Sequence, residues 1–293
     1  MKNCKDLIIG LLHKCELILP DSLYLKWLYR LSIGQRLNLS NPQTFNEKIQ
    51  WLKLNNKRPE YTRMVDKIEA KNYVANIIGE KYIIPTLAVY DRPENIDFNS
   101  LPNQFVLKTT HGGGGQAVVI CKDKSTFNIK RAIEVLSVAM DSDISRLYKE
   151  YPYKDVPRRI IVEPYMSNDG RELEDYKIHN FNGVPRLILV CRNRFSGVMI
   201  DDFYSTQWEL MDIHRPGHPT SKSPMTKPDQ LDELLELARK LAGEIPFLRT
   251  DFYIINGNVF FGELTFYPAS GLSKFEPSIW DSILGNWLKL PYE

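Results

Sequence analysis

Residues 105–120 read FVLKTTHGGGGQAVVI, in which two runs of strand-forming residues flank a histidine and four consecutive glycines. Glycine has no Cβ, so the backbone N–H groups of such a loop can close on a ligand and form a nest for an anion. Phosphate is the anion that we expect there. On glycine content alone, a slack hairpin tip that binds nothing is an equal alternative.

The residues around the glycines exclude three common uses of such a loop. No Lys-Ser or Lys-Thr pair follows, which excludes a P-loop, and a strand follows where a dinucleotide-binding fingerprint would open a helix. His-Gly-Gly-Gly is also an oxyanion motif of some lipases, but the sequence has no G-x-S-x-G nucleophile elbow. Lys108, at the end of the preceding strand, would bring an ammonium group to the loop amides, which favours phosphate.

A second stretch with chemical potential is RTDFYIINGNVFFGELTF, residues 249–266. It predicts a hairpin that turns at Asn256-Gly257, and this turn brings Asp251 and Glu263 to the same end. Two such carboxylates, completed by substrate phosphates, form the usual Mg²⁺ site of phosphoryl transfer. Ordinary exposed carboxylates are the alternative, but Glu263 has apolar neighbours, where an unpaired carboxylate would be costly.

A third, weaker signal is IIVEPYM, residues 160–166. A core strand that ends in an acidic residue and a proline leads into a connecting segment. Its backbone edge could bind an adenine, with the apolar strand residues forming the slot.

Composition limits the class of protein. Hydrophobic residues make up 43% and charged residues 25% of the 293 residues, as in ordinary globular proteins. The formal net charge is +2, because 38 basic and 36 acidic residues nearly cancel, so we expect no nucleic-acid partner. The four cysteines lie far apart without a C-x-x-C pair, which argues against structural zinc and a disulfide framework, and favours a reducing cytoplasm.

The N-terminal stretch MKNCKDLIIGLLHKCELILP has apolar residues at helical spacing. His13, Lys14 and Glu16 interrupt it before it reaches the length of a signal peptide or a transmembrane span. We favour core packing for this helix, with contact to a membrane surface as the alternative.

The pattern along the chain predicts an α+β protein in three parts. Residues 1–104 form an α-rich N-terminal region with helices at 23–31, after a capping box of Thr44 and Glu47, and from Thr62 to Gly79. Residues 105–165 form a small α+β lobe with the glycine-rich flap, a helix over 129–151 and a strand. Residues 166–293 form a large lobe with hairpins turned at Asn182-Gly183 and Asn256-Gly257 and helices at 228–243 and near 278–288.

Five motifs in this order, KTTHGGGG, VEPYM, DYKIHNFNG, RTDFY and FGELTF, resemble the ATP-grasp superfamily. More narrowly, the chain is similar to the TupA-like ATP-grasp proteins of bacterial capsule and teichuronopeptide biosynthesis, some of which carry the label glycosyltransferase. TFNEKIQWLKLNN and DKIEAKNYV extend the similarity over residues 40–290. The resemblance implies two α+β lobes that clamp a nucleotide, ATP and Mg²⁺ as cofactors, and ligation of a carboxylate to an amine through an acyl phosphate.

The resemblance also implies roles for individual residues. Lys67 and Lys108 would contact ATP phosphates, and the flap would close over them with His111, Gly112, Gly113, Gly114 and Gly115. Glu163, Pro164 and Tyr165 would meet adenine, and Asp175 or Lys177 would reach the ribose or the phosphates. Asp251 and Glu263, with Thr265, would hold Mg²⁺, and Arg249 would join Lys108 as a catalytic residue by steadying the acyl phosphate. Many superfamily members have asparagine where this chain has Thr265, so its metal shell would be one ligand weaker or completed by water.

The substrate residues are less defined. Arg192 and Arg194 would share one face of a strand and could grip a substrate carboxylate such as that of a uronic acid, and a solvated rim is the alternative. Residues 214–228 read as a mobile loop that could cover the cleft, with His214 and His218 facing solvent.

The leading hypothesis is therefore an ATP-dependent carboxylate-amine ligase of surface polysaccharide biosynthesis. Its partners would be a small-molecule or glycan carboxylate and an amine or amino acid, in the cytoplasm or at the inner face of the membrane. A glycosyltransferase is the alternative, with Asp141-Ser142-Asp143 as a metal-binding D-x-D, although helical spacing around this tripeptide favours a helix end. A nucleotide-binding protein without catalysis is a third hypothesis. The sequence does not indicate the identity of the substrates or the oligomeric state.

Overall fold

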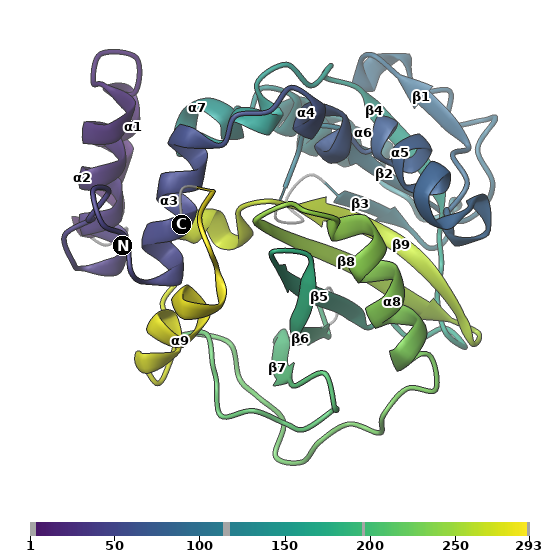
Figure 1. The fold of residues 1–293 in the computed structure, drawn as a ribbon. Coiled ribbons are helices and arrows are strands. Elements are labelled where there is room, and N and C mark those ends of the chain that lie inside the picture. The colour runs from purple at the N-terminus through teal and green to yellow at the C-terminus, as the bar shows by residue number, and fades with distance from the viewer. Residues whose placement is uncertain (1–3, 114–117, 195–196, 292–293) are drawn as a thin grey trace.

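The computed structural model describes residues 4–113, 118–194 and 197–291 and has an α+β architecture with two antiparallel sheets (Figure 1). The small sheet has the order β1-β4-β2-β3, with strands β1 (Ala88–Tyr90), β2 (Phe105–Thr109), β3 (Val118–Cys121) and β4 (Ile160–Pro164). The large sheet has the order β7-β6-β5-β8-β9, with strands β5 (Asp175–Phe181), β6 (Val184–Arg192), β7 (Ile200–Tyr204), β8 (Phe247–Ile255) and β9 (Asn258–Thr265).

Tight turns connect the hairpins of the large sheet, as the sequence predicts. Asn182 and Gly183 join β5 to β6, and Asn256 and Gly257 join β8 to β9, with positive φ angles at all four residues. Asparagine and glycine tolerate this left-handed backbone better than other residues. Gly183 is also required by space, because a Cβ there would lie 2.1 Å from the carbonyl oxygen of Gly243.

Alternation along the strands separates a core face from a functional face in each sheet. In the small sheet, Phe105 and Leu107 of β2 pack with Leu136 of α6 (Ile129–Met140), while Val106 and Lys108 face the other way and line a pocket. In the large sheet, the apolar side of α8 (Leu231–Ala242) joins the core that contains Tyr176 and Ile178 of β5. The intervening residues of β5 therefore carry their polar side chains on the opposite face.

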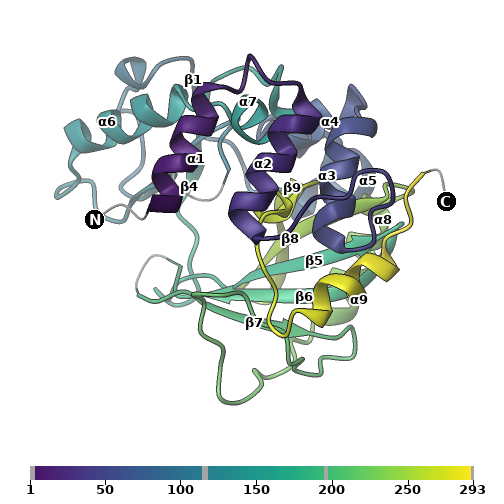
Figure 2. The same ribbon diagram turned by 90° about the vertical axis from the view of Figure 1, so that its left-hand side faces the viewer.

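The remaining helices surround the two sheets. α3 (Phe45–Asn55) begins with the predicted capping box of Thr44 and Glu47 and packs against α9 (Ile279–Trp287). α1 (Cys4–Lys14) and α2 (Asp21–Ile33) form a hairpin at the outer edge of the molecule (Figures 1 and 2). Short helical segments complete the chain: α7 (Ile144–Tyr148), η1 (Glu80–Tyr82), η2 (Pro93–Asn95), η3 (Tyr151–Tyr153) and η4 (Pro268–Gly271).

The helix predicted from Thr62 to Gly79 is wrong as one element. It is two helices, α4 (Glu60–Val65) and α5 (Glu69–Ile78), and Thr62 lies inside the first. Asp66 breaks the helix because its carboxylate accepts from the Ile68 amide at 2.9 Å and from Arg159 at 2.9 Å. This break lets the Lys67 backbone bond to Thr110 of the small lobe.

The helix predicted over 129–151 is also broken. α6 ends at Met140, and Asp143 caps α7 by accepting from the Arg146 amide at 3.0 Å. The D-x-D tripeptide therefore lies between two helices. No helix in the described ranges is both long and apolar enough to cross a bilayer.

Candidate functional site

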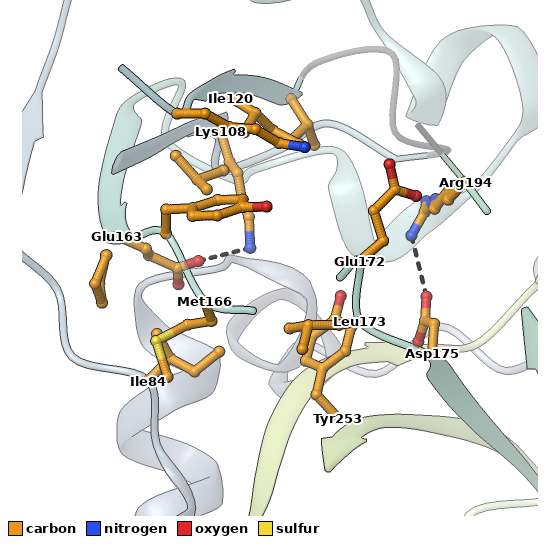
Figure 3. A pocket seen from close by; sticks show the side chains of 15 residues that line it. Ile84, Lys108, Ile120, Glu163, Met166, Glu172, Leu173, Asp175, Arg194 and Tyr253 are labelled. Carbon is orange, nitrogen blue, oxygen red and sulfur yellow. Dashed lines mark hydrogen bonds and ion pairs between the residues drawn. The ribbon is translucent and has the colours of Figure 1, made fainter. Parts of the chain in front are cut away.

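A pocket of about 120 Å³ lies between the two sheets (Figure 3). Its apolar lining comes mainly from the small sheet and the segment after β4, and its polar lining from both sheets. The residues are Ile84, Val106, Lys108, Val118, Ile120, Lys122, Glu163, Pro164, Tyr165, Met166, Glu172, Leu173, Asp175, Arg194 and Tyr253. An apolar slot with a few converging charged groups is the usual form of a ligand pocket.

Glu163 lies at one side of this pocket between two lysines. Its Oε2 accepts from Lys108 Nζ and its Oε1 from Lys71 Nζ, both at 2.6 Å. Burial opposes ionisation of Glu163, but the two lysines outweigh it and lower the pKa of the carboxyl to about 2. One carboxylate shared by two cations leaves a net positive charge, which suits an anionic ligand.

Lys67 connects the N-terminal region to the flap. Its Nζ donates to the carbonyl oxygen of Gly112, and burial lowers its pKa. A Cβ on Gly113 would lie 3.2 Å from Ile144 Cδ1, so the start of the flap packs closely against α7. Gly114 and Gly115 lie outside the described residues.

His111 is buried at the start of the flap, with 4% of its surface exposed. Burial, and then the neighbouring charge of Arg158, lower the pKa of its imidazole. Neither ring nitrogen of His111 has a hydrogen-bond partner among the described residues.

The functional face of the large sheet carries a second group of charges, here called the sheet-face cluster: Asp175, Lys177, Arg249, Asp251 and Glu263. Lys177 Nζ donates to Asp175 and Asp251 at 2.5 Å each. Arg249 donates to Asp251 at 2.6 and 2.7 Å and to Glu263 at 2.7 Å. Burial disfavours the Lys177 ammonium, but the two aspartates outweigh it and raise its pKa.

The donor atoms of this cluster fit a magnesium ion with an incomplete protein shell. Arg249 Nη2 lies 2.7 Å from both Asp251 Oδ2 and Glu263 Oε1, so the two carboxylates converge on one point. Thr265 Oγ1 lies 3.3 Å from the same Glu263 oxygen. Within the described ranges no group of three or more His, Cys, Asp or Glu side chains could hold a metal. Mg²⁺ is commonly bound by one or two protein carboxylates, and substrate and water supply its remaining ligands.

The structure separates the two arginines that the sequence predicts to share a face. Arg194 lies in the pocket and donates to Asp175 at 3.0 Å. Arg192 instead donates to Asp202 at 2.6 Å and to Ser221. The predicted shared strand face of Arg192 and Arg194 is therefore wrong, because Arg194 lies beyond the end of β6 and outside its alternation. A role of either arginine in binding a substrate carboxylate stays a prediction.

The segment between β7 and α8 is anchored to the body of the molecule. The His214 backbone pairs with Glu276, and Trp208 stacks on Tyr204 with a centroid distance of 4.3 Å. Asp201 is fully buried and accepts from Arg215 Nε at 2.8 Å, with His218 Nδ1 3.2 Å away. These contacts contrast with the freely moving loop that composition predicts.

The structure brings five of the twelve predicted nucleotide residues to one pocket. Lys108, Glu163, Pro164, Tyr165 and Asp175 line one pocket. Lys67 and Glu263 line a second, smaller pocket.

Sequence reasoning missed Lys71 and His179. Lys71 follows Lys67 by four residues, and this spacing was its only signal. His179 pairs across the sheet with Arg249, and burial, then Arg249, lower its pKa to about 3.

Residues 47–289 match the family model described as TupA-like ATPgrasp. No curated protein in the comparison matches the chain.

Among solved structures, the chain is similar to D-alanine-D-alanine ligase from Helicobacter pylori, with 15% identity, a TM-score of 0.44, and coverage of 78% of this chain and 63% of that one. It is also similar to N5-carboxyaminoimidazole synthetase from Staphylococcus aureus, complexed with ADP, with 14% identity, a TM-score of 0.46, and coverage of 85% and 60%. The chain thus spans less than two thirds of the length of either protein.

Proposed function

This chain belongs to the TupA-like ATP-grasp family, and from that premise we propose that it is an ATP-dependent carboxylate-amine ligase. The observation that carries the proposal is the convergence of Asp251 and Glu263 on one point beside Arg249, next to a pocket whose lining combines an apolar slot with charged groups such as Lys108 and Arg194. A nucleotide needs both kinds of surface, and phosphoryl transfer needs the carboxylates.

The nucleotide would lie in the pocket between the sheets. Its base would occupy the slot beside Val106, Ile120 and Met166, with hydrogen bonds to the backbone from Glu163 to Tyr165. Asp175 is suited to the ribose, because its Oδ1 is buried and has no hydrogen-bond partner among the described residues. Lys108 and Lys67 would meet the phosphates.

Two bond exchanges complete the reaction. An oxygen of the substrate carboxylate attacks the γ-phosphorus, the bond to the β-phosphate oxygen breaks, and ADP leaves. The amine nitrogen then attacks the acyl carbon, inorganic phosphate leaves, and the amine loses a proton to solvent. Arg249 would steady the negative charge that develops on the acyl phosphate. When bound by Asp251, Glu263 and Thr265, Mg²⁺ supplies charge neutralisation of the phosphate oxygens.

Because the motifs of this chain resemble those of bacterial capsule and teichuronopeptide biosynthesis proteins, we propose a sugar acid such as a uronic acid as the carboxylate and an amino acid or amine as the acceptor. A cytoplasmic location, where ATP is supplied, is part of the same proposal. The D-x-D tripeptide does not support the glycosyltransferase alternative, because its Asp143 caps α7 and pairs with Arg158.

The test is ADP release screened over uronic acids crossed with amino acids. We expect release only with ATP, acid and amine together, and loss of release in Lys108→Ala and Glu263→Ala. Glu236→Ala and Lys240→Ala are matched controls, because this exposed ion pair lies on α8. Unchanged turnover in both site variants would disprove the site assignment. A thermal shift with UDP-sugars in place of ATP would support the glycosyltransferase instead.

A further inference from the structure

The hairpin of α1 and α2 exposes an unusual amount of apolar surface. Of the 15 large hydrophobic side chains that the structure records as exposed, seven lie within residues 7–27. We call them the hairpin surface: Leu7, Ile8, Leu11, Leu17, Ile18, Leu23 and Trp27. A concentration of exposed apolar side chains in one part of a fold often marks a site of interaction.

This surface is not part of the hairpin's own core. The inward face of α2 packs through Tyr24, Leu25 and Leu28, which are at most 1% exposed, and Ile9 and Leu12 of α1 pack against them. Leu7 and Leu11, and likewise Leu23 and Trp27, are four residues apart on a helix and so share a face. The outward faces therefore have apolar residues that the fold of this chain leaves uncovered.

The apolar residues are most exposed at the tip of the hairpin. Leu17 and Ile18, between the helices, are 75% and 79% exposed, and Trp27 is 55% exposed. The two helices lie side by side along one flank of the molecule (Figure 2). The side chains of the tip and of the outward faces could therefore insert into an apolar environment without a change in the conformation of the cleft.

The charges around the hairpin surface are mostly positive. Lys14, Lys26, Arg30 and Arg36 are exposed. Of the carboxylates in residues 6–36, Glu16 is buried against Arg146, and Asp21 is paired with Lys149 at 3.0 Å. Asp6 is the one exposed carboxylate in that stretch that has no ion pair among the described residues.

We propose that the hairpin surface binds the headgroup region of an anionic lipid bilayer, with the helices lying on the membrane. Leucine, isoleucine and tryptophan enter the boundary between headgroups and acyl chains, and flanking lysine and arginine attract anionic lipids. The matched family region begins only at residue 47, so this hairpin lies outside it. The proposal is independent of the ligase reaction.

The charge around the hairpin surface favours an anionic bilayer over a second copy of this chain as its binding partner. A two-fold contact through the hairpin surface would place the same net-positive patch, which includes Lys14, Lys26 and Arg30, on both sides of the interface. Such a contact would oppose like charges, whereas an anionic membrane satisfies them.

The experiment is flotation of the full chain with vesicles of phosphatidylcholine alone or with about one third phosphatidylglycerol. We expect flotation with the anionic vesicles, weakened by salt. The double variant Leu17→Asp, Ile18→Asp should lower the partition coefficient by about tenfold or more. Lys14→Glu, Lys26→Glu should abolish the preference for anionic vesicles.

Val138→Asp is the matched control, because Val138 on α6 is 75% exposed, as is Leu17. It should float like the wild type, and all variants should keep the same melting temperature. Failure of the wild type to bind anionic vesicles, or equal binding by the Leu17/Ile18 variant, would overturn the proposal. So would a wild-type dimer in lipid-free solution that this variant converts to monomer, because the surface would then be a self-interface.

Discussion

The two ends of the cleft between the sheets satisfy their charges in opposite ways. At the small sheet, one carboxylate, Glu163, is shared by Lys71 and Lys108. At the large sheet, Asp175, Asp251 and Glu263 face Lys177, Arg249 and Arg194. The first end has an excess of one positive charge, whereas the second is balanced.

This difference indicates which ligand each end can accept. An anion such as a phosphate can join the small-sheet end directly, since a cation there is only half neutralised. A second anion at the balanced large-sheet end would be repelled unless a cation accompanied it. That asymmetry is what a nucleotide with its magnesium ion would require.

The largest loss of turnover and stability should come from replacing Asp251, the most buried carboxylate at the large-sheet end of the cleft. Asp251 is 1% exposed and accepts from both Lys177 and Arg249. Asp251→Asn should lower ADP-forming turnover by about a thousandfold and the free energy of unfolding by about 3–5 kcal/mol, because two buried cations lose their partner. Turnover and urea unfolding measure the two effects.

The variant Glu263→Gln tests whether the sheet-face cluster contributes to turnover independently of its contribution to the free energy of unfolding. The Glu263 side chain is 39% exposed, so this variant should lose turnover while its unfolding free energy changes by less than about 1 kcal/mol. Equal destabilisation by both variants would contradict the assignment of the exposed carboxylate to ligand binding.

The next effect concerns acid stability at the small-sheet end. The pKa of Glu163 is lowered from 4.5 to about 2, so its stabilising contribution is present above pH 4.5 and lost as the pH falls toward 2. Glu163→Gln should remove this pH dependence and lower the unfolding free energy at neutral pH by about 3 kcal/mol. Urea unfolding at a series of pH values from neutral down to about 2 measures this free energy. If the variant and the wild type lost stability equally as the pH falls, the pairing of Glu163 with the two lysines would be contradicted.

His179 should add acid sensitivity at a higher pH. Its pKa is lowered from 6.5 to about 3, so the unfolded chain binds a proton more readily and stability falls as the pH drops from 6.5 toward 3. NMR titration of the imidazole measures this directly, and protonation near 6.5 in the folded protein would contradict the structure.

A smaller effect should distinguish the two lysines at Glu163. Lys108 lines the pocket, whereas Lys71 lies behind Glu163 and donates to the Ile84 carbonyl at 2.7 Å. Lys108→Ala should weaken binding of a non-hydrolysable ATP analogue by about tenfold, and Lys71→Ala by about threefold or less. Calorimetric titration compares them, and the reverse order would place the phosphates on the other side of Glu163.

The smallest effect should come from Thr265. Replacing its hydroxyl by an amide carbonyl in Thr265→Asn adds a stronger oxygen donor next to Glu263. The Mg²⁺ concentration that gives half-maximal turnover should fall by about threefold. A rise would indicate that Thr265 does not face the metal.

Local patterns predicted much of the fold. Asn-Gly turns, strand alternation and the Thr44/Glu47 capping box depend on neighbouring residues, and each appears where the sequence places it. The break at Asp66 could not be predicted in this way, because it depends on Arg159 and Thr110, which are distant in sequence. Periodicity alone continues a helix through such a position.

The same distinction holds for the candidate site. The hairpin turn predicts only that Asp251 and Glu263 lie near the same end, because its regular register would pair Asp251 with Gly262. A register shift between Asp251 and Phe252 makes Asp251 and Glu263 cross-strand partners. Lys71 and the separation of Arg192 from Arg194 depend on which element packs against which, and on where β6 ends. The roles of these residues in catalysis stay predictions.

Transfer of oxygen from the acid to phosphate tests the central claim most directly. A uronic acid found active in the ADP screen would be labelled with oxygen-18 in its carboxylate, and the released phosphate analysed by mass spectrometry. An acyl phosphate requires that one labelled oxygen appear in each phosphate released. Phosphate without label, formed while ADP accumulates in the presence of acid and amine, would contradict a carboxylate-amine ligase.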